Sequence, residues 1–385
     1  MTNSRAQDVR RAGIWIALAL AGCDVSGAER SIAPLTSSAL AMPAAQLKAA
    51  PNLVSVVPPP PVPPAPAEVA PAPASDPQLS PRPPELFAGL MQEDILRELT
   101  RARASDLRPV GVTSLVFRAE LDAPFRAALK AATLSRPGGP VNEAAAYRLA
   151  RCLGLDNVPP VMLRRMSGAE IQRKLAYVFQ PRWLEFEPQL VIGPLGFIEV
   201  AAIYWIEDLQ DLGLESFTMT QRAFGWLKID GEAPPERAQL AKQLSTMIAF
   251  DYLIGNWDRW SGGNLKGTGA GDFLYMRDHD AGFAGRISEP LQRRMLEPVQ
   301  RTQRYSRSFV QAVRALDRET LIRELSRDPL LAEHIRLDAS PGPQPARPVL
   351  DRRVFDQLFD RRDTLLTYIK ALIEEHGEKR VLSFD

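Results

Sequence analysis

The sequence predicts an α+β fold in which a small sheet-bearing lobe precedes a helical lobe. Segments rich in β-branched and aromatic residues gather before residue 210, whereas longer segments with apolar residues at helical spacing follow it. The chain has 385 residues, of which 45% are hydrophobic and 24% are charged, so it can bury one sizeable core or two small ones. This composition excludes a wholly disordered protein.

The charge balance and the metal-binding residue types exclude two further classes. Lys plus Arg (47) nearly cancels Asp plus Glu (46), so no broad positive field draws the molecule onto nucleic acid, and we expect no nucleic-acid partner. Cys23 and Cys152 lie far apart, and His279, His334 and His376 share no metal-ligand spacing. A disulfide scaffold and a Cys/His zinc site are therefore excluded.

Residues 1–22 have the pattern of a secretion signal. A basic start is followed by the uncharged apolar run Ala12–Gly22, which is much shorter than the ~20 residues that a membrane-spanning helix needs. The run ends in Leu20-Ala21-Gly22-Cys23, which resembles the lipobox of bacterial lipoproteins. This resemblance implies that Cys23 is acylated and anchors the chain to a membrane of the bacterial cell envelope, outside the cytoplasm. The alternatives are a buried helix with an incidental cysteine, and a cytoplasmic protein whose signal is not processed.

Residues 23–84 are predicted to be an Ala/Pro-rich tether. Residues 51–84 hold 14 of the 34 prolines, which prevents helix and sheet and favours polyproline II at about 3.1 Å per residue. The fold therefore begins near residue 85. We expect the sheet-bearing lobe over residues 85–210 and the helical lobe over residues 211–385.

Four elements are predicted at the start of the sheet-bearing lobe. Apolar spacing indicates an opening helix over 86–99 and a helix over 142–154 that Gly154 ends. Between them, the segments 112–120 and 125–130 have the composition and alternation of strands. A bend at Asp122-Ala123-Pro124 predicts that these two strands form a hairpin.

The remaining elements follow from capping and periodicity. Ser167-x-x-Glu170 has the capping-box pattern and predicts a helix as far as Phe179. Residues 196–206 form the most strand-like segment of the chain, and residues 235–254 show helical spacing. The apolar pattern between residues 350 and 372 predicts two amphipathic helices.

Polar residues with a shared chemistry follow the helix predicted over 235–254. Asp258 and Asn264 precede a glycine-rich turn and a short apolar strand, and Asp278 and Asp280 come directly after that strand. Phosphoryl transfer requires a carboxylate at the attacking hydroxyl, and an Asn and an Asp that hold divalent metal on the phosphates. Such hard oxygen ligands suit Mg²⁺ or Mn²⁺. The alternative is a loop of solvated acids, because Asp, Asn and Gly are ordinary turn residues.

Two earlier segments make this pattern more specific. Lys130 ends a predicted strand, and Glu143 lies in Asn142-Glu143-Ala144-Ala145-Ala146-Tyr147-Arg148-Leu149, which leads to Leu153-Gly154 and Val158-Pro159-Pro160. The chain here resembles the atypical kinases of the secretory pathway, the Golgi casein kinase and xylosylkinase family. The segment Leu253-Ile254-Gly255-Asn256-Trp257-Asp258-Arg259 resembles the same family, and more distantly the phosphatidylinositol and HipA-like kinases. The resemblance spans residues 110 to 284.

The resemblance implies a two-lobed protein-kinase-like fold and a role for each residue. Lys130 would contact the α- and β-phosphates of ATP and pair with Glu143, and Asp258 would face the acceptor hydroxyl. Asn264 and Asp278 would ligate Mg²⁺ or Mn²⁺. Alternatively, Lys130 is a solvated strand end, Glu143 is an exposed helix charge, and the aspartates are turn or cap residues.

The sequence departs from the kinase pattern at three places. Asn264 lies six positions after Asp258, where most kinases have five, so Gly262-Gly263 must absorb one residue or Asn264 is not the ligand. Asp280 stands where related kinases carry a glycine, which makes it a second metal ligand or the actual one. A glycine-rich nucleotide loop is not obvious around Gly111.

The sequence therefore supports two functions. The first is an ATP-dependent phosphotransferase that moves the γ-phosphoryl group to a hydroxyl of a protein, a sugar or another small acceptor. The alternative is a catalytically inactive pseudokinase that acts as a membrane-tethered binding module.

Overall fold

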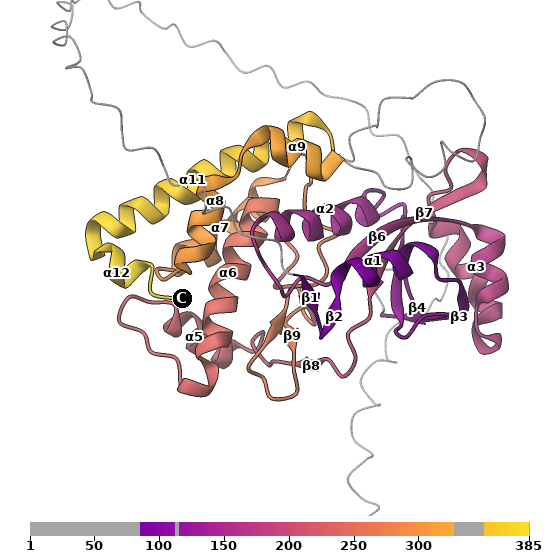
Figure 1. Ribbon diagram of the computed structural model, residues 1–385, viewed down its shortest axis with the longest axis horizontal. Coiled ribbons are helices and arrows are strands. Elements are labelled where there is room, and N and C mark those ends of the chain that lie inside the picture. Colours follow the sequence, from indigo (N-terminus) through magenta and orange to yellow (C-terminus); the bar gives the residue numbers. More distant parts are fainter. Residues whose placement is uncertain (1–84, 112–114, 286, 327–349, 385) are drawn as a thin grey trace, which may run out of the picture. The chain divides into compact units, whose positions relative to one another are not determined.

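The structure is a computed structural model, and it describes residues 85–111, 115–285, 287–326 and 350–384 (Figure 1). Strands dominate the N-terminal part of this region and helices dominate the C-terminal part. The predicted division into a sheet-bearing region and a helical region is therefore confirmed.

Some of the predictions fall outside the described residues. These are the signal peptide, the tether with its acylated Cys23, and the first residues of the strand predicted over 112–120.

A five-stranded antiparallel sheet forms the N-terminal part of the fold. Its spatial order is β3-β4-β5-β7-β6. The predicted hairpin is present, because β4 pairs with β5 and places Val116 opposite Lys130. The strands are β3 (Ala104–Val110), β4 (Val116–Leu121), β5 (Ala127–Ala131), β6 (Val161–Ser167) and β7 (Phe197–Tyr204).

Sequence analysis missed the strands β3 and β6, which form the two edges of this sheet. β3 contains Pro109, and β6 contains the adjacent Arg164 and Arg165, so neither has the clean apolar alternation of a central strand. Edge strands tolerate proline and charged residues because the backbone groups on their outer side form no hydrogen bonds to a neighbouring strand.

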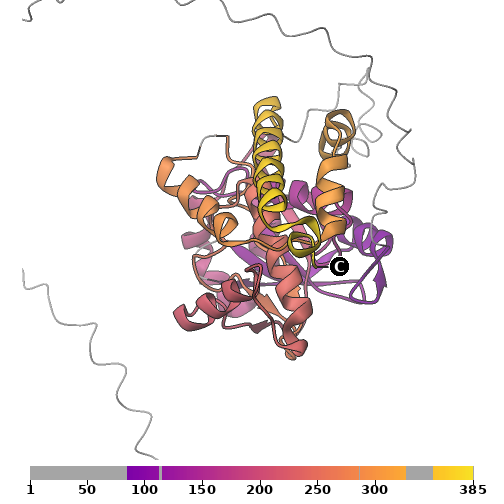
Figure 2. The same ribbon diagram turned by 90° about the vertical axis from the view of Figure 1, so that its left-hand side faces the viewer.

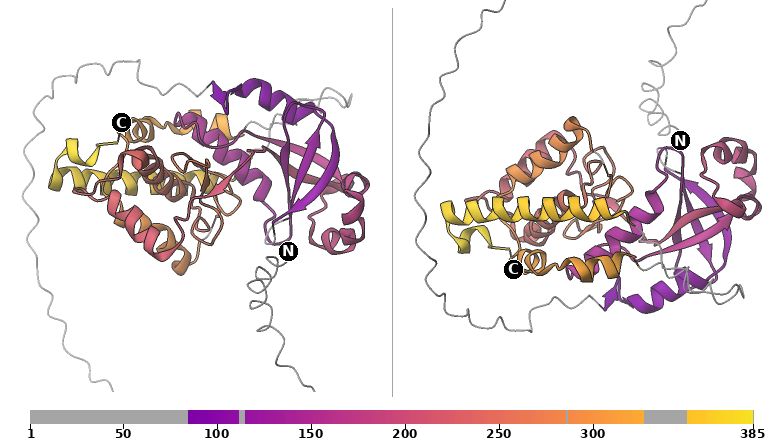
Figure 3. Two further views of the ribbon diagram at one scale, coloured as in Figure 1. Left: turned by 90° about the horizontal axis from the view of Figure 1, so that it is seen from below. Right: turned by 90° about the horizontal axis from the view of Figure 1, so that it is seen from above.

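The two faces of the sheet contribute to different cores. Leu129 and its cross-strand partner Ala202 belong to an outer core with α1 (Gln92–Arg101), α3 (Gly168–Lys174) and α4 (Trp183–Phe186). On the opposite face, Ala201 joins the core that α2 (Gly139–Cys152) shares with the C-terminal helices. Figure 3 shows α2 on the side of the sheet that faces these helices. Lys130 pairs with Ala201, so its side chain also lies on the α2 face.

The opening helix begins later than predicted. Residues 86–91 form a small hairpin of β1 (Leu86–Phe87) and β2 (Leu90–Met91), and α1 begins only at Gln92. Ala88 and Gly89 have φ values of 49° and 81°, which a right-handed helix cannot contain. The apolar spacing of Leu86 and Leu90 was therefore misleading.

The helix predicted from Ser167 has the expected start but an earlier end. The Ser167 hydroxyl accepts a hydrogen bond from the Glu170 backbone N–H at 3.1 Å, which confirms the predicted cap. α3 ends at Lys174, and the 3₁₀ helices η1 (Tyr177–Arg182), η2 (Glu187–Gln189) and η3 (Pro194–Gly196) follow it around α4. Pro181, inside η1, has no N–H for a continuing α-helix.

The C-terminal part is built around α6 (Ala238–Ile254), most of whose residues are buried. α11 (Arg352–His376) packs against α6 (Figure 2). A small three-stranded sheet of β8 (Gln210–Asp211), β9 (Lys266–Gly267) and β10 (Leu274–Tyr275) lies beside these helices. The other elements are η4 (Pro235–Arg237), α5 (Phe217–Trp226), α7 (Glu289–Arg301), α8 (Arg307–Ala315), α9 (Arg318–Ser326) and α12 (Glu378–Val381).

The prediction of two amphipathic helices in the tail was wrong. The apolar residues belong to the single 25-residue helix α11, and α12 adds only one turn after Gly377. The charged residues Asp360 to Asp363 lie inside this helix, and charged residues of this kind are compatible with a helix interior. In the described part of the chain, no helix has both the length and the apolar character needed to span a bilayer.

Candidate active site

Lys130 is the centre of a buried ionic cluster. It lies on the α2 face of β5 and is only 5% exposed. Its ammonium group donates to Glu143 Oε1 of α2 at 2.8 Å and to Asp278 Oδ1 at 2.5 Å, and lies 2.9 Å from Asp280 Oδ2. Four of the predicted site residues, which span 150 positions of sequence, therefore meet around one nitrogen atom.

Each group in the cluster has a shifted pKa. Burial opposes the charge on Lys130, but the three carboxylates outweigh it and raise the lysine pKa. Burial likewise disfavours a charged Glu143, yet Lys130 and His279 lower the pKa of this carboxyl well below its usual range. Burial also opposes ionisation of Asp278, and Lys130 overcomes it and lowers the pKa. Asp280 differs, because burial and its acidic neighbours outweigh Lys130 and raise its pKa.

The loop that carries Asp278 and Asp280 is held by α2. The Asn142 amide donates to the Asp280 carbonyl oxygen at 2.8 Å, and the His279 backbone N–H donates to Glu143 Oε1 at 3.1 Å. Asp278 has a φ of 64°, a strained value for a residue with a Cβ. The turn is thus fixed by several contacts that keep both carboxylates on Lys130.

His279 is buried between Glu143 and the ring of Phe250. Its Nδ1 lies 3.5 Å from Glu143 Oε2, and the two rings meet edge to face with centroids 5.7 Å apart. These contacts are those of a packing and hydrogen-bonding residue.

A second buried ion pair shapes the loop that carries Asp258. Arg259 is 1% exposed and donates to Asp251 of α6 at 2.7 Å and 3.0 Å. Its third nitrogen donates to the backbone carbonyl of Arg277. Asn256 donates to the same Asp251 carboxylate at 2.9 Å. Arg259 therefore ties the end of α6 and the two acidic loops together.

Sequence analysis did not identify this ion pair. A signal was present, because Arg259 follows Asp258 in the segment that resembles the kinases, and Asp251 precedes it by eight positions. Only the structure shows that the helix end Gly255, with a φ of 73°, turns the chain back so that the two side chains meet.

The structure shows how the extra residue before Asn264 is accommodated. Gly262 and Gly263 have φ values of 112° and 77°, which glycine adopts at little cost. This turn lets the Asn264 amide donate to the Asp258 carbonyl oxygen at 3.0 Å and to Ser261 Oγ at 3.3 Å. Asn264 thus lies beside the Asp258 loop, but no hydrogen bond joins it to Asp278 or Asp280 in the described region.

Arg136 connects Asp258 to the lysine cluster. Its guanidinium lies 3.8 Å from Asp258 Oδ2 and 3.8 Å from Asp280 Oδ1, and it covers the Trp257 ring at 5.0 Å. Both distances to oxygen exceed a normal hydrogen bond. Arg136, which lies just before α2, was not predicted to belong to the site, because no motif in the sequence marks it.

The site can be tested for its fit to a divalent cation. Four carboxylates surround two cations, Lys130 and Arg136, which leaves two excess negative charges. The acids are Glu143, Asp258, Asp278 and Asp280.

Within the described residues, no three His, Cys, Asp or Glu side chains form a complete metal cage. Mg²⁺ in nucleotide sites takes only one or two carboxylates and fills its shell with phosphate oxygens and water. Asp278 and Asp280, which lie 2.5 Å and 2.9 Å from the Lys130 ammonium, supply the two carboxylates of that requirement.

The region that would cover a nucleotide is only partly described. β3 pairs with β4 as far as Val110 opposite Val116, and Gly111, whose φ is 80°, directly follows β3. Residues 112–114, which follow Gly111, lie outside the described residues.

Solved structures identify the fold. The Golgi casein kinase matches with a TM-score of 0.57 and 15% identity, over 76% of this chain and 77% of that one. Its fold is the fold of this chain. A Golgi casein kinase structure with Mn/ADP bound matches with a TM-score of 0.56 and 15% identity, over 76% and 78%. A structure of hydra Fam20 with sugar matches with a TM-score of 0.56 and 18% identity, over 75% and 91%.

These matches confirm the predicted resemblance at the level of the fold. No protein-family profile matches the sequence, and no curated protein matches it either. At this identity the likeness does not extend to substrate or catalytic competence.

Proposed function

We propose that the protein is an ATP-dependent phosphotransferase that moves the γ-phosphoryl group to a hydroxyl acceptor. The observation that carries this proposal is the meeting of Lys130, Glu143 and Asp278 around one buried ammonium group, with Asp258 on the adjoining loop. The kinase-like fold supports the proposal. The similar Golgi casein kinase structure with Mn/ADP bound is consistent with a nucleotide and a divalent metal.

Each side chain has a chemical task in this proposal. Lys130 stays paired with Glu143 and donates to phosphate oxygens, while Asp278 and Asp280 hold the metal ion with Asn264. When bound there, Mg²⁺ or Mn²⁺ would supply positive charge to the phosphates. Asp258, whose side chain is 30% exposed, orients the acceptor hydroxyl and accepts its proton.

The decisive experiment separates binding from transfer. ATP binding to the full-length protein is measured with and without Mg²⁺ or Mn²⁺, and release of phosphate to water is measured as acceptor-independent turnover. Asp278→Ala should abolish metal-dependent ATP binding, whereas Asp258→Asn should keep binding and lose turnover. Asp272→Ala, in the neighbouring β9–β10 turn, is the control and should change neither. Unchanged ATP binding in Asp278→Ala would refute the proposed site.

A pseudokinase is the second candidate, and one observation favours it. The Lys130 ammonium already contacts three carboxylates, so a nucleotide must displace at least one of them to be bound by the lysine. A module of this kind would give no turnover, and an Asp258→Asn variant would keep its full biological activity.

We also propose that Cys23 anchors the chain to a membrane of the cell envelope. The support is the basic start, the short apolar run and the lipobox-like segment. Cells fed a fatty-acid probe should label the wild-type protein and the Cys152→Ser variant, but not Cys23→Ser. Labelling that persists in Cys23→Ser would exclude this anchor, and a protein without label in the cytoplasmic fraction would support the unprocessed form.

A further inference from the structure

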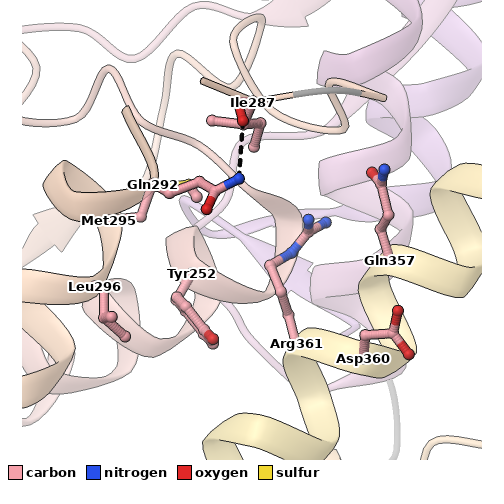
Figure 4. A pocket seen from close by; sticks show the side chains of 8 residues that line it. All are labelled: Tyr252, Ile287, Gln292, Met295, Leu296, Gln357, Asp360 and Arg361. Atoms are coloured by element: carbon pink, nitrogen blue, oxygen red, sulfur yellow. Dashed lines mark hydrogen bonds between the residues drawn. The ribbon is translucent and has the colours of Figure 1, made fainter. Parts of the chain in front are cut away.

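A second cavity lies between α7, α11 and the end of α6, and it shares no lining residue with the Lys130 cluster (Figure 4). Its volume is about 280 Å³. Ile287, Met295 and Leu296 give it an apolar wall. Gln292, Gln357 and Arg361 bring polar groups to it.

Arg361 is the unusual residue of this cavity. Its Nε donates to the Leu253 carbonyl oxygen at 2.8 Å, but its Nη2 is buried and has no hydrogen-bond partner. No carboxylate of the described chain forms an ion pair with it, although Asp360 is its neighbour in sequence. Burial accordingly lowers the pKa of Arg361 to about 10. Arg361 is half-buried as a residue, but a buried N–H donor without an acceptor is costly, so its Nη2 indicates a missing partner.

A second unpaired polar atom lies close by on the same helix. Gln357 Oε1 is also buried without a partner. Gln357 and Arg361 are one helical turn apart, and Figure 4 shows their side chains extending in the same direction from α11. The guanidinium group of Arg361 and the amide oxygen of Gln357, which accepts no hydrogen bond, therefore lie next to each other in the lining of the cavity.

The position of the guanidinium is fixed by backbone. Gly255 ends α6 with a φ of 73°, and a Cβ added there would lie 3.3 Å from Arg361 Cζ and 3.1 Å from Ile287 Cδ1. The missing side chain therefore allows Arg361 to pack on the helix end that precedes Asn256 and Asp258. A preorganised cation of this kind loses little side-chain entropy when an anion binds.

We propose that this cavity binds a small monocarboxylate with a compact apolar tail, whose carboxylate pairs with Arg361. Nη1 and Nη2 of the planar guanidinium are available as hydrogen-bond donors, and two such donors match the two oxygens of a carboxylate. The apolar wall of Ile287, Met295 and Leu296 receives the tail. A dianion such as phosphate fits less well, because Arg361 is the single cation among the lining residues and Asp360, which also lines the cavity, repels two negative charges more strongly than one. The volume restricts the ligand to a small molecule.

The proposal is tested by titrating the full-length protein with hexanoate and following the ligand by saturation-transfer NMR and calorimetry. Hexanamide has the same shape without the charge, and inorganic phosphate has the charge without the tail. Hexanoate should bind about tenfold or more tightly than either of them. Tighter binding of inorganic phosphate would overturn the carboxylate assignment, and equal binding of hexanamide would overturn the role of Arg361.

Three variants locate the binding. Arg361→Met should weaken hexanoate binding about tenfold or more, because it removes the cation and keeps the length of the side chain. Leu296→Trp fills the mouth of the cavity and should block binding while Arg361 is intact. Arg293→Met, on an exposed position of α7, should bind hexanoate as the wild type does. If Arg361→Met fails to fold, Leu296→Trp provides the test of the site. If Leu296→Trp binds hexanoate as tightly as the wild type does, the proposed site is refuted.

Discussion

One ammonium group contacts three carboxylates at Lys130, so its loss removes the one counter-charge that they share. We expect Lys130→Met to lower the free energy of unfolding by about 3–5 kcal/mol, because it leaves buried acids without a counter-charge. The stability of this variant should rise as the pH falls from 7 to 5, since the unpaired carboxyls then take up protons. Urea unfolding at several pH values measures both effects.

Lys370→Met is the control for the lysine variant. Lys370 is 74% exposed, so its loss should change the stability by less than about 0.5 kcal/mol at every pH. Equal stability of Lys130→Met and Lys370→Met would show that the cluster does not depend on the ammonium group.

The pH dependence of the wild-type protein follows from the directions of two pKa shifts. Glu143 has a lowered pKa in the folded state. Its contribution to the free energy of unfolding is therefore complete above its pKa in the unfolded chain, about 4.3, and is lost as the pH falls through its pKa in the folded protein. Lys130 has a raised pKa in the folded state. Its contribution to the free energy of unfolding is therefore complete below the lysine pKa of the unfolded chain, about 10.4, and is lost only at still higher pH.

We therefore expect a stability plateau between these limits and an acid limb below about pH 4. Glu143→Gln should flatten the acid limb, because the amide has no proton to gain. Urea unfolding between pH 3 and pH 7 compares the two proteins, and an unchanged acid limb in the variant would contradict the assignment.

Asp280 is expected to behave in the opposite way to Glu143. Its pKa is raised in the folded state, so its ionisation costs stability in full above the folded value; the cost shrinks as the pH falls through the folded value and is gone below the unfolded value. Asp280→Asn should therefore leave the metal-free protein as stable as the wild type, or more stable. The same variant should weaken metal-dependent ATP binding about tenfold or more if Asp280 ligates the cation. A large loss of stability at pH 7 would show that the ion pair with Lys130 outweighs the repulsion.

At the scale of single elements, local signals were the most reliable. The cap at Ser167, the extent of α6 as far as Ile254 and the stripe of α2 each depend on neighbours in sequence, and each was predicted correctly. The edge strands β3 and β6 were missed because their partners, not their own pattern, make them strands.

The same distinction applies to the site. Its acids and its lysine lie in segments that resemble known kinases, so the residue types and their order were visible in the sequence. Arg136 and the pair of Asp251 with Arg259 were not visible, because their contacts join separate elements and have no local pattern.

The turn at Gly262 and Gly263 offers a test of an element rather than a side chain. No heavy atom lies within 4 Å of a Cβ added at Gly263, so Gly263→Ala changes only the backbone preference at a φ of 77°. We expect a loss of about 1–2 kcal/mol in the free energy of unfolding. The strained turn should also displace Asn264 and weaken metal-dependent ATP binding.

Gly225→Ala in α5 is the matched control, because that site is equally open but its glycine has no positive φ. It should keep or slightly increase the stability. If Gly263→Ala and Gly225→Ala have the same effect on both measurements, the turn does not position Asn264.

At the scale of the molecule, one hydrophobic core extends across both lobes. The inner face of the sheet, with Val161, Leu163 and Ala201, belongs to the same hydrophobic core as α2 and α6. The ionic cluster lies along this shared region, because Lys130 and Glu143 come from the sheet-bearing lobe and Asp278 and Asp280 from the helical lobe. Contacts of both kinds therefore couple the two lobes.

This coupling predicts that residues 85–210 do not fold without the helical lobe. Their separation would expose the apolar stripe of α2 and leave Lys130 with Glu143 alone, while only the outer core of the sheet stays complete. We expect the 85–210 fragment to lack dispersed amide resonances in NMR spectra and to bind hydrophobic dyes. Residues 85–385, which include both lobes, should give dispersed spectra and serve as the control. A well-dispersed spectrum of 85–210 would show that the outer core suffices, and that the two lobes are independent folding units joined by the nucleotide site.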